Sequence, residues 1–381
     1  VRISGCSVPW SGPELAAPAS GSGGAQNIAY DWNNDGRDDL LLSGTTNWLL
    51  VLSNGDSLAP AVNTGIATNG ANTAIAFDAN GDGLTDLVTR NGGVLYRRLR
   101  NGPRSDVLVS AMDGFGVTAT FSYRPLTDAS IYTRGSGAIY PEQDQQSTAY
   151  VVSELGITDG TGLGSATATR YSYQGLRRHL LGRGILGFTT RTSVDTTLGI
   201  ETRIEETRRQ DFPYTGLPAM VVVRQGSGAP VSETTYAWST LNLGNGVALR
   251  RFPYASSTVQ RQYEVGGAYD GAEIATTTRV VAAIDATSGL VTDETTTITE
   301  VAGGINAGSS SSLRTLHTSV LNDKTNWCLG RPQGMQLTAS HTLTGGAAIT
   351  RSFSQNWDGL KCRPTQQRLE TGNSQWQVSF G

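Results

Sequence analysis

The sequence predicts an all-β protein, and three observations support this fold class. First, threonine, valine and tyrosine recur in short alternating runs, including TATFSY at 118–123 and TTTITEV at 295–301, with the period expected of strands. Second, glycine is abundant, at 47 of 381 residues, as expected where many turns connect strands. Third, no stretch of 12 residues keeps the i, i+3, i+4, i+7 apolar spacing of an amphipathic helix.

The first hundred residues contain an internal duplication with an offset of 47 residues. The strand-like IAY at 28–30 falls on IAF at 75–77, and the polar loop that follows it falls on a second polar loop. The register continues to an Asn-Gly dipeptide at 54–55 and again at 101–102, which is a hairpin signal in both copies. A period of about 40–50 residues with several strands is typical of propeller blades. We therefore expect two blades, ending near Arg104, with any further blades preceding Val1 or coming from elsewhere.

The two polar loops carry oxygen-bearing side chains at the spacing of a calcium site. Aspartate, asparagine, aspartate and aspartate stand at positions 1, 3, 5 and 9, with glycine at position 6 for a tight bend. The predicted ligands are Asp31, Asn33, Asp35 and Asp39 with the carbonyl of Arg37, and Asp78, Asn80, Asp82 and Asp86 with the carbonyl of Leu84. Zinc would require histidine or cysteine, and neither residue type is near. The sequence thus predicts two Ca²⁺ sites.

The alternative for these loops is a solvated Asp/Asn/Gly turn between strands, which these residues often form. The duplication in one register favours metal binding over this alternative. An EF-hand is excluded, because position 12 is Leu42 or Thr89 rather than glutamate, and the flanking segments are strand-like. The carboxylates of each loop would repel one another unless a cation lay between them. We expect a structural ion that fixes the hairpin, since no substrate-facing constellation lies beside it.

Composition restricts the partners. The formal net charge is −3, and no run of lysine or arginine exceeds two residues, so we expect no nucleic-acid partner. The longest apolar stretch, WLLVL at 48–52, is far shorter than the ~20 residues of a spanning helix, so we expect no membrane-spanning segment. The chain begins at Val1 without a charged and apolar leader, which indicates a processed chain or a piece of a longer one.

Two of the three cysteines have similar surroundings. Cys328 lies in NWCLGRP and Cys362 lies in NWDGLKCRP, so we interpret them as a candidate disulfide. The alternative is a pair of buried free thiols. Cys6 would then be unpaired, or paired with a residue outside this chain.

The sequence offers no convergent acid, base and nucleophile, so we expect no catalytic residues and no enzyme. His179, His317 and His341 lie far apart in the sequence, and each fits a surface or strand position better than a catalytic base. The segment ETRIEETRRQD at 201–211 mixes acids and arginines. Alternating charges at this spacing favour a salt-bridged strand face over a catalytic carboxylate pair.

Several stretches resemble known families. The two loops are similar to the FG-GAP, integrin-type calcium loops of β-propellers. Four later stretches resemble the region that precedes the repeat core of Rhs/YD-repeat proteins, which is shared with the B component of Tc toxins and with SpvB-like proteins. These stretches are DGFGVTATFSYRPLTDASIYT at 113–133, LLGRGILGF at 180–188, RQDFPYTGLP at 209–218 and TNWCLGRP at 325–332. Only degenerate YD-like repeats are present, such as Ile284-Asp285 followed by Gly289-Leu290.

The resemblance implies a large, secreted bacterial protein whose strands form a hollow shell around a toxic cargo, with a propeller as a docking element. On this basis the fold is FG-GAP propeller-type blades followed by an extended antiparallel array like an Rhs/Tc shell. We expect calcium-binding blades at 1–105, a region like Tc-B/SpvB at 106–210 and a strand array at 211–381. The expected partners are the rest of such a polypeptide or complex, with a toxin cargo or a cell-surface ligand. The alternative is an adhesion module that binds a glycan or a protein.

Overall fold

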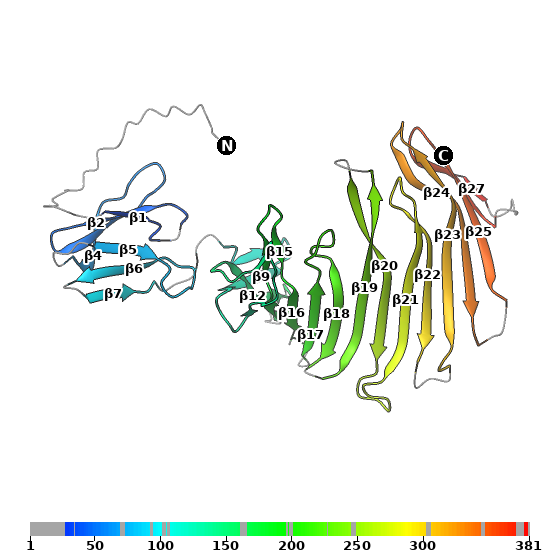
Figure 1. Ribbon diagram of the computed structural model, residues 1–381, viewed down its shortest axis with the longest axis horizontal. Coiled ribbons are helices and arrows are strands. Elements are labelled where there is room, and N and C mark those ends of the chain that lie inside the picture. The colour runs from blue at the N-terminus through cyan, green and yellow to red at the C-terminus, as the bar shows by residue number, and fades with distance from the viewer. Residues whose placement is uncertain are drawn as a thin grey trace. The chain divides into compact units, whose positions relative to one another are not determined.

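The computed structural model shown in Figure 1 describes residues 27–379 of the protein, with the exception of several short segments. Those segments are 34, 69–72, 92–93, 101–103, 105–106, 161–165, 196, 198–200, 227, 245–248, 302–305, 344–346 and 371–376. The described residues form strands and turns without a helix, so the all-β prediction is confirmed. In this part of the chain no helix has the length and apolar character needed to cross a membrane. Cys6 lies outside the described residues.

The chain divides into two compact units, Val1–Ala129 with Ser147–Val152, and Ser130–Gln146 with Ser153–Gly381. The three segments predicted from the sequence stay a prediction. Their second boundary, at 210/211, falls between β17 and β18, which are neighbours in one sheet.

The first unit contains two small antiparallel sheets and a hairpin. Strands β1 to β4 form one sheet in sequence order, β5 to β7 form the other, and β8 pairs with β9. The bounds are β1 Ile28–Tyr30, β2 Asp39–Ser43, β3 Asn47–Val51, β4 Val62–Ala67, β5 Thr73–Phe77, β6 Asp86–Asn91, β7 Val94–Arg98, β8 Ser110–Met112 and β9 Thr118–Pro125.

The 47-residue duplication appears as a structural repeat. Strands β1, β2 and β3 correspond to β5, β6 and β7, and the register is the same in both sheets: Tyr30 pairs with Asp39, and Phe77 pairs with Asp86. The two sheets pack on a shared apolar core. Its central side chains are Leu41 and Trp48, which are 0% and 1% exposed, and Leu87 of the second sheet contributes at 4%.

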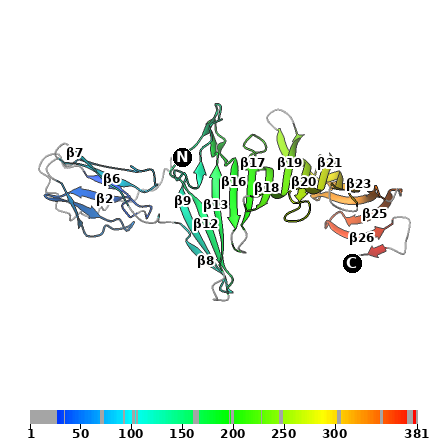
Figure 2. The same cartoon turned by 90° about the horizontal axis from the view of Figure 1, so that it is seen from below.

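The second unit is dominated by one long antiparallel meander. Each strand from β16 to β27 pairs antiparallel with the next strand along the chain, and β13 pairs with β16 at its start. In Figure 1 these strands stand side by side in one row, coloured from green to red. Figure 2 shows the row rotating progressively, as the right-handed twist of sheets requires.

A small sheet, β11-β14-β15, and the parallel pair β10–β13 lie at the beginning of this unit. Strand β12 begins before the division between the two units and ends after it. The bounds are β10 Tyr132–Thr133, β11 Glu142–Asp144, β12 Tyr150–Thr158, β13 Ala166–Gln174, β14 Arg177–His179, β15 Gly184–Gly187, β16 Thr190–Asp195, β17 Thr202–Arg208, β18 Pro218–Gln225, β19 Pro230–Leu243, β20 Arg250–Tyr263, β21 Glu273–Ile284, β22 Val291–Glu300, β23 Ser310–Asp323, β24 Cys328–His341, β25 Ile349–Asp358, β26 Arg363–Leu369 and β27 Gln377–Ser379.

The meander is a single layer with little buried apolar surface. Among the described residues of β16 to β26, only Thr192, Val222 and Cys328 are buried. Polar pairs between neighbouring strands take the place of a core. Hydroxyl groups meet in pairs such as Ser312 with Ser340, and ion pairs join β19 to β20, β21 to β22 and β22 to β23. Each such pair contributes a few tenths of a kcal/mol to about 1 kcal/mol.

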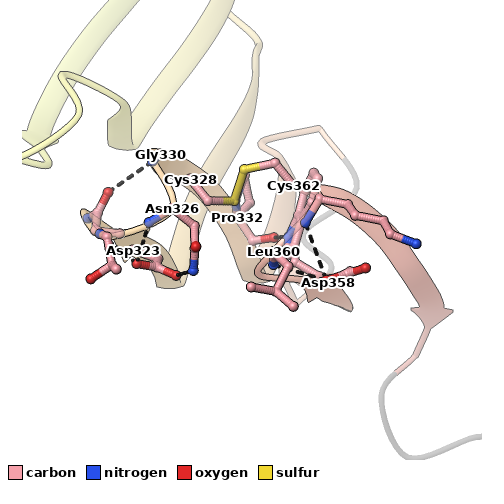
Figure 3. The surroundings of a disulfide bond; sticks show 12 residues. Asp323, Asn326, Cys328, Gly330, Pro332, Asp358, Leu360 and Cys362 are labelled. Atoms are coloured by element: carbon pink, nitrogen blue, oxygen red, sulfur yellow. Dashed lines mark hydrogen bonds between the residues drawn. A yellow bond between two sulfur atoms is a disulfide. The ribbon is translucent and has the colours of Figure 1, made fainter.

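The turns at one end of the meander contact one another. The side chain of Asn322, before the β23–β24 turn, donates to Asp285 Oδ1 in the β21–β22 turn at 3.0 Å, and its carbonyl oxygen accepts from the Gly330 N–H at 2.9 Å. Further along, Cys328 at the start of β24 is joined by a disulfide to Cys362, just before β26, with 5.5 Å between their Cα atoms (Figure 3). The disulfide therefore links hairpin β23–β24 to hairpin β25–β26.

Removal of this disulfide should destabilise the C-terminal hairpins. The two cysteines are 34 residues apart, and closing a loop of that size in the unfolded chain contributes about 3–4 kcal/mol in the chain-entropy treatment. We expect Cys328→Ser with Cys362→Ser to lower the urea midpoint of the β23–β27 transition, measured by hydrogen exchange. Cys6→Ser is the matched control. Equal protection of these strands in the double variant and the parent would contradict the expectation.

Candidate metal centre

Each of the two acidic loops connects the first and second strand of its sheet. The first loop spans 31–38 between β1 and β2, and the second spans 78–85 between β5 and β6. All of the predicted ligand side chains lie in or directly beside these loops. The side chains at positions 1, 3 and 5 of each loop lie close together, whereas the position-9 aspartate is buried within the sheet. The two loops repeat the same hydrogen bonds, residue by residue, with the 47-residue offset.

The aspartate at position 1 closes each loop. In the first loop Asp31 Oδ1 accepts the Asp35 N–H at 3.0 Å, and Asp31 Oδ2 accepts the Gly36 N–H at 2.9 Å. Gly36 has a φ of +82°, which favours glycine at this bend. The equivalent bonds of the second loop are Asp82 N–H to Asp78 Oδ1 at 3.1 Å and Gly83 N–H to Asp78 Oδ2 at 2.8 Å.

The side chains at positions 3 and 5 face each other across the loop. Asn33 Nδ2 donates to Asp35 Oδ2 at 2.9 Å, and Asp35 Oδ1 accepts the Arg37 N–H at 2.9 Å. Asn33 Oδ1 and Asp31 Oδ1 accept from the same N–H group, that of Asp35, so these two oxygens converge. In the second loop the same bonds join Asn80 to Asp82, Asp82 to the Leu84 N–H, and Asn80 with Asp78 to the Asp82 N–H.

The aspartate at position 9 is a buried bridge within each sheet. Asp39 is 0% exposed, and its two oxygens accept the N–H groups of Trp32 and Ser53, both at 2.8 Å. One bond fixes the start of the loop and the other fixes the chain after β3. Asp86, 1% exposed, accepts the equivalent N–H groups of Ala79 at 2.9 Å and Arg100 at 2.7 Å. The sequence predicts these two carboxylates as ligands, and it does not reveal this bridging.

The donor set can be tested against Ca²⁺. The side-chain oxygens at positions 1 and 3 converge on the N–H group of position 5 in each loop, and hard oxygens of this kind suit Ca²⁺. The acidic side chains alone do not suffice, because among the described residues no three His, Cys, Asp or Glu side chains are grouped so as to hold a metal ion. The side-chain oxygen of asparagine and the backbone carbonyl at position 7 would have to complete the shell. With these oxygens, the residue types present fit the ion.

The two loops differ in charge. The guanidinium of Arg37 contacts Asp35 Oδ2 at 2.5 Å. The Asn33 amide, together with the backbone and side chain of Arg37, lowers the pKa of the partly exposed Asp35 carboxyl. The first loop therefore carries a cation of its own beside the position-5 carboxylate. At the equivalent place the second loop has Leu84, which is 3% exposed.

The second loop is also covered by a neighbouring segment. The hydroxyl groups of Thr127 and Tyr150 donate to the backbone carbonyls of Gly81 and Asp82. Gly83, with a φ of +81°, fits closely beneath Tyr150: a Cβ here would lie 2.6 Å from the ring. The guanidinium carbon of Arg104 lies over the Tyr150 ring, 5.0 Å from its centroid. Nothing in the sequence spacing indicated this cover, since it comes from a segment outside the duplication.

Two of the stretches that suggested the family resemblance meet in the second unit. The side chain of Gln210, which is 8% exposed, donates to the Gly175 carbonyl at 2.8 Å and to the Gly187 carbonyl at 2.7 Å, and it accepts from the Thr189 hydroxyl at 3.0 Å. It thereby ties RQDFPYTGLP to LLGRGILGF.

The three histidines lie in different surroundings. His179 and His341 each accept a hydrogen bond from a nearby backbone N–H. Burial lowers the pKa of His317.

The fold and these loops define an all-β protein with a duplicated acidic-loop sheet and a long single-layer meander. Comparison with known families is consistent with this class: residues 53–216 match the insecticide toxin TcdB middle/N-terminal region. The matched segment includes the second loop but not the first. No curated protein matches the chain.

Two solved structures share the fold. A Tc holotoxin pore from Photorhabdus luminescens, with a substitution in TccC3, superposes with a TM-score of 0.65 at 10% identity, over 87% of this chain and 21% of that chain. A complex of TcdB2, TccC3 and Cdc42 superposes with a TM-score of 0.69 at 10% identity, over 90% of this chain and 22% of that chain. The protein thus spans about a fifth of the length of these chains, and its fold is like that part of Tc toxins.

Loss of a bridging carboxylate should unfold the corresponding sheet more easily. We expect Asp39→Asn or Asp86→Asn to lower the free energy of unfolding of the first unit by about 2–4 kcal/mol, because the amide presents a donor to one of two buried N–H groups. Urea denaturation followed by tryptophan fluorescence measures this change. Asp38→Asn is the control, since Asp38 is the exposed neighbour of Asp39. An effect of the same size in all three variants would refute the bridging role.

Proposed function

We propose that this chain is a non-enzymatic, calcium-stabilised structural segment of a larger secreted protein like the Tc toxins. In this proposal the first unit supplies two FG-GAP-type blades of a docking propeller, and the meander of the second unit supplies part of a shell. The match of 53–216 to the TcdB region and the shared fold with two Tc toxin structures support it. The main support is an apolar sheet face in the first unit. It is covered in the first sheet, and the equivalent face of the second sheet is exposed.

That face follows from the register of the two sheets. In the first sheet, Ile28, Leu41 and Trp48 lie on one face and pack against the second sheet. The second sheet meets them with its opposite face, which carries Ala74 and Leu87. The two sheets therefore stack with one face of the first sheet against the opposite face of the second, as we propose for neighbouring blades of a propeller.

The second sheet repeats the packing face of the first but leaves it open. With the 47-residue offset, Ile28, Tyr30 and Trp48 correspond to Ile75, Phe77 and Leu95. Tyr30 and Trp48 are 8% and 1% exposed, whereas Ile75, Phe77 and Leu95 are 56%, 47% and 70% exposed. An apolar face of this kind is costly in water and marks a place for a partner. The partner we propose is a further blade of the same design from the rest of the polypeptide.

Calcium would stabilise the acidic loop of each blade. The ion would be held by the oxygens at positions 1, 3, 5 and 7 of each loop, and its charge would offset the repulsion between carboxylates. The position-9 carboxylates would then fix the same loop from its buried side. Because Arg37 already supplies a positive charge to the first loop, we expect the second loop to bind the ion more tightly.

The meander has the architecture expected of a shell wall rather than of an independent domain, because it is a single layer without a core of its own. A sheet that buries only Thr192, Val222 and Cys328 between β16 and β26, among the described residues, has two faces available to other material. The proposed cargo or neighbouring shell segments would cover one of them. This part of the proposal rests on the shared fold with the Tc toxin structures and on the single-layer architecture.

Calcium should stabilise the first unit through the second loop. A site that binds only the folded form adds about 2.7 kcal/mol at a hundredfold excess of Ca²⁺ over its dissociation constant. We expect EDTA to lower the melting temperature of the parent chain, Asp82→Ala to abolish most of the response, and Asp35→Ala to abolish less of it. Elemental analysis of the purified protein gives the bound metal directly. Absence of bound calcium together with an unchanged melting temperature would defeat this part of the proposal.

The open blade face should be dispensable for folding of this chain but required for assembly. We expect Phe77→Asp with Leu95→Asp to leave the melting temperature within about 2 °C and to reduce self-association, because both side chains are exposed. In the full-length parent, the same variant should expose the first unit to limited proteolysis. The matched control is Trp48→Ala, the buried equivalent, which should destabilise the isolated chain by about 3–5 kcal/mol. Unchanged proteolysis of the full-length variant would exclude a blade partner at this face.

A further inference from the structure

A cavity of about 400 Å³ lies within the first unit, where its two sheets meet near the first acidic loop. Its apolar lining includes Tyr30, Ile66 and Leu87. Polar groups come from both sheets, because Asn33 belongs to the first loop and Arg98 ends β7. This volume and this mixture of an apolar floor with a few convergent polar groups are typical of sites for small ligands.

Two aromatic rings form one wall. The ring centroids of Tyr30 and Trp32 are 5.8 Å apart and their planes are tilted by 57°. Both side chains line the cavity.

Two guanidinium groups line the same cavity without an acidic partner. Arg98 donates from Nη1 to the Thr89 hydroxyl at 2.9 Å, and Arg100 donates from Nη1 to the Asp31 carbonyl at 3.5 Å. Among the described residues neither arginine forms an ion pair. A guanidinium has five N–H donors, so most of those on Arg98 and Arg100 remain for another acceptor. The carboxylate of Asp31, whose backbone carbonyl accepts from Arg100, is itself engaged by backbone N–H groups.

The backbone of this cavity is fixed by the buried carboxylates. Asp39 accepts the N–H of Trp32, and Asp86 accepts the N–H of Arg100. The wall that carries the indole and the wall that carries one guanidinium are therefore both anchored before any ligand arrives. A site with fixed walls loses less conformational entropy when it binds.

From these features we infer that the cavity binds a small carboxylate attached to a ring. The planar guanidinium groups of Arg98 and Arg100 match a carboxylate, and the rings of Tyr30 and Trp32 match a ring face. Thr85 adds a further polar group to the lining, for a hydroxyl substituent. Two sources share this chemistry, acidic sugars and aromatic acids. The inference is independent of the proposed blade and shell roles, because it needs only the two sheets of this chain.

Titration of the intact chain with defined probes tests the inference. The probes are glucuronate, N-acetylneuraminate and benzoate, with glucose and acetate as the neutral and ring-free controls, and the readouts are tryptophan fluorescence and calorimetry. We expect saturable binding of at least one ring carboxylate, and binding of glucose and acetate at least tenfold weaker. Tighter binding of the sugar acids identifies an acidic glycan as the source, and tighter binding of benzoate identifies an aromatic acid.

Variants locate the binding. Arg98→Ala and Arg100→Ala should each weaken binding at least tenfold, and Arg98→Lys should weaken it in part, since the charge remains while the planar fork is lost. Arg97→Ala is the matched control, because Arg97 pairs with Val88 on the opposite face of the sheet. Melting temperatures show whether each variant folds. The inference fails if no ring carboxylate binds the parent, if glucose binds equally, or if Arg97→Ala and the two cavity variants behave alike.

Discussion

The first unit depends on two buried carboxylates that act as acceptors for backbone N–H groups. Asp39 and Asp86 each join the start of an acidic loop to the chain that follows the third strand of the same sheet. A buried charge without partners would be very costly, so these bonds leave each sheet with one low-energy arrangement of its loop. The bonds also fix the backbone of Trp32 and Arg100 in the walls of the cavity, while the apolar core joins the two sheets to each other. Position 7 of the loop can then differ, as exposed Arg37 and buried Leu84 do, without changing the sheet.

The second unit meets a different constraint, because its strands have no second layer to pack against. Hydrophobic burial, which stabilises most sheets, contributes little between β16 and β26. The meander relies on its backbone ladder, on hydroxyl and ion pairs between neighbouring strands, and on contacts between turns at one end. Gln210 performs a related task at the start of the meander, where it satisfies two glycine carbonyls of neighbouring segments. Such a sheet can be long and thin, which a compact core would not allow.

Much of the fold and part of the site could be predicted from the sequence. The alternation of residues and the lack of helical periodicity were enough for the all-β class, and the offset of 47 residues indicated two copies of one sheet. The similar settings of Cys328 and Cys362 pointed to the bond that the structure contains. The spacing could not show that the position-9 aspartates face inward, because burial depends on which face of β2 and β6 meets the core. It also could not reveal Thr127 and Tyr150, which reach the second loop from outside the repeat.

The disulfide in the turns has a mechanical meaning. Strands in a meander can be peeled away one by one from a free edge, since each is held only by its neighbours. Because the disulfide joins the turn of hairpin β23–β24 to the turn of hairpin β25–β26, a pull on the C-terminal edge cannot extend the segment between Cys328 and Cys362. The last two hairpins must therefore detach together, as one block. In a single-layer sheet, a disulfide of this kind replaces several small unfolding steps with one larger step.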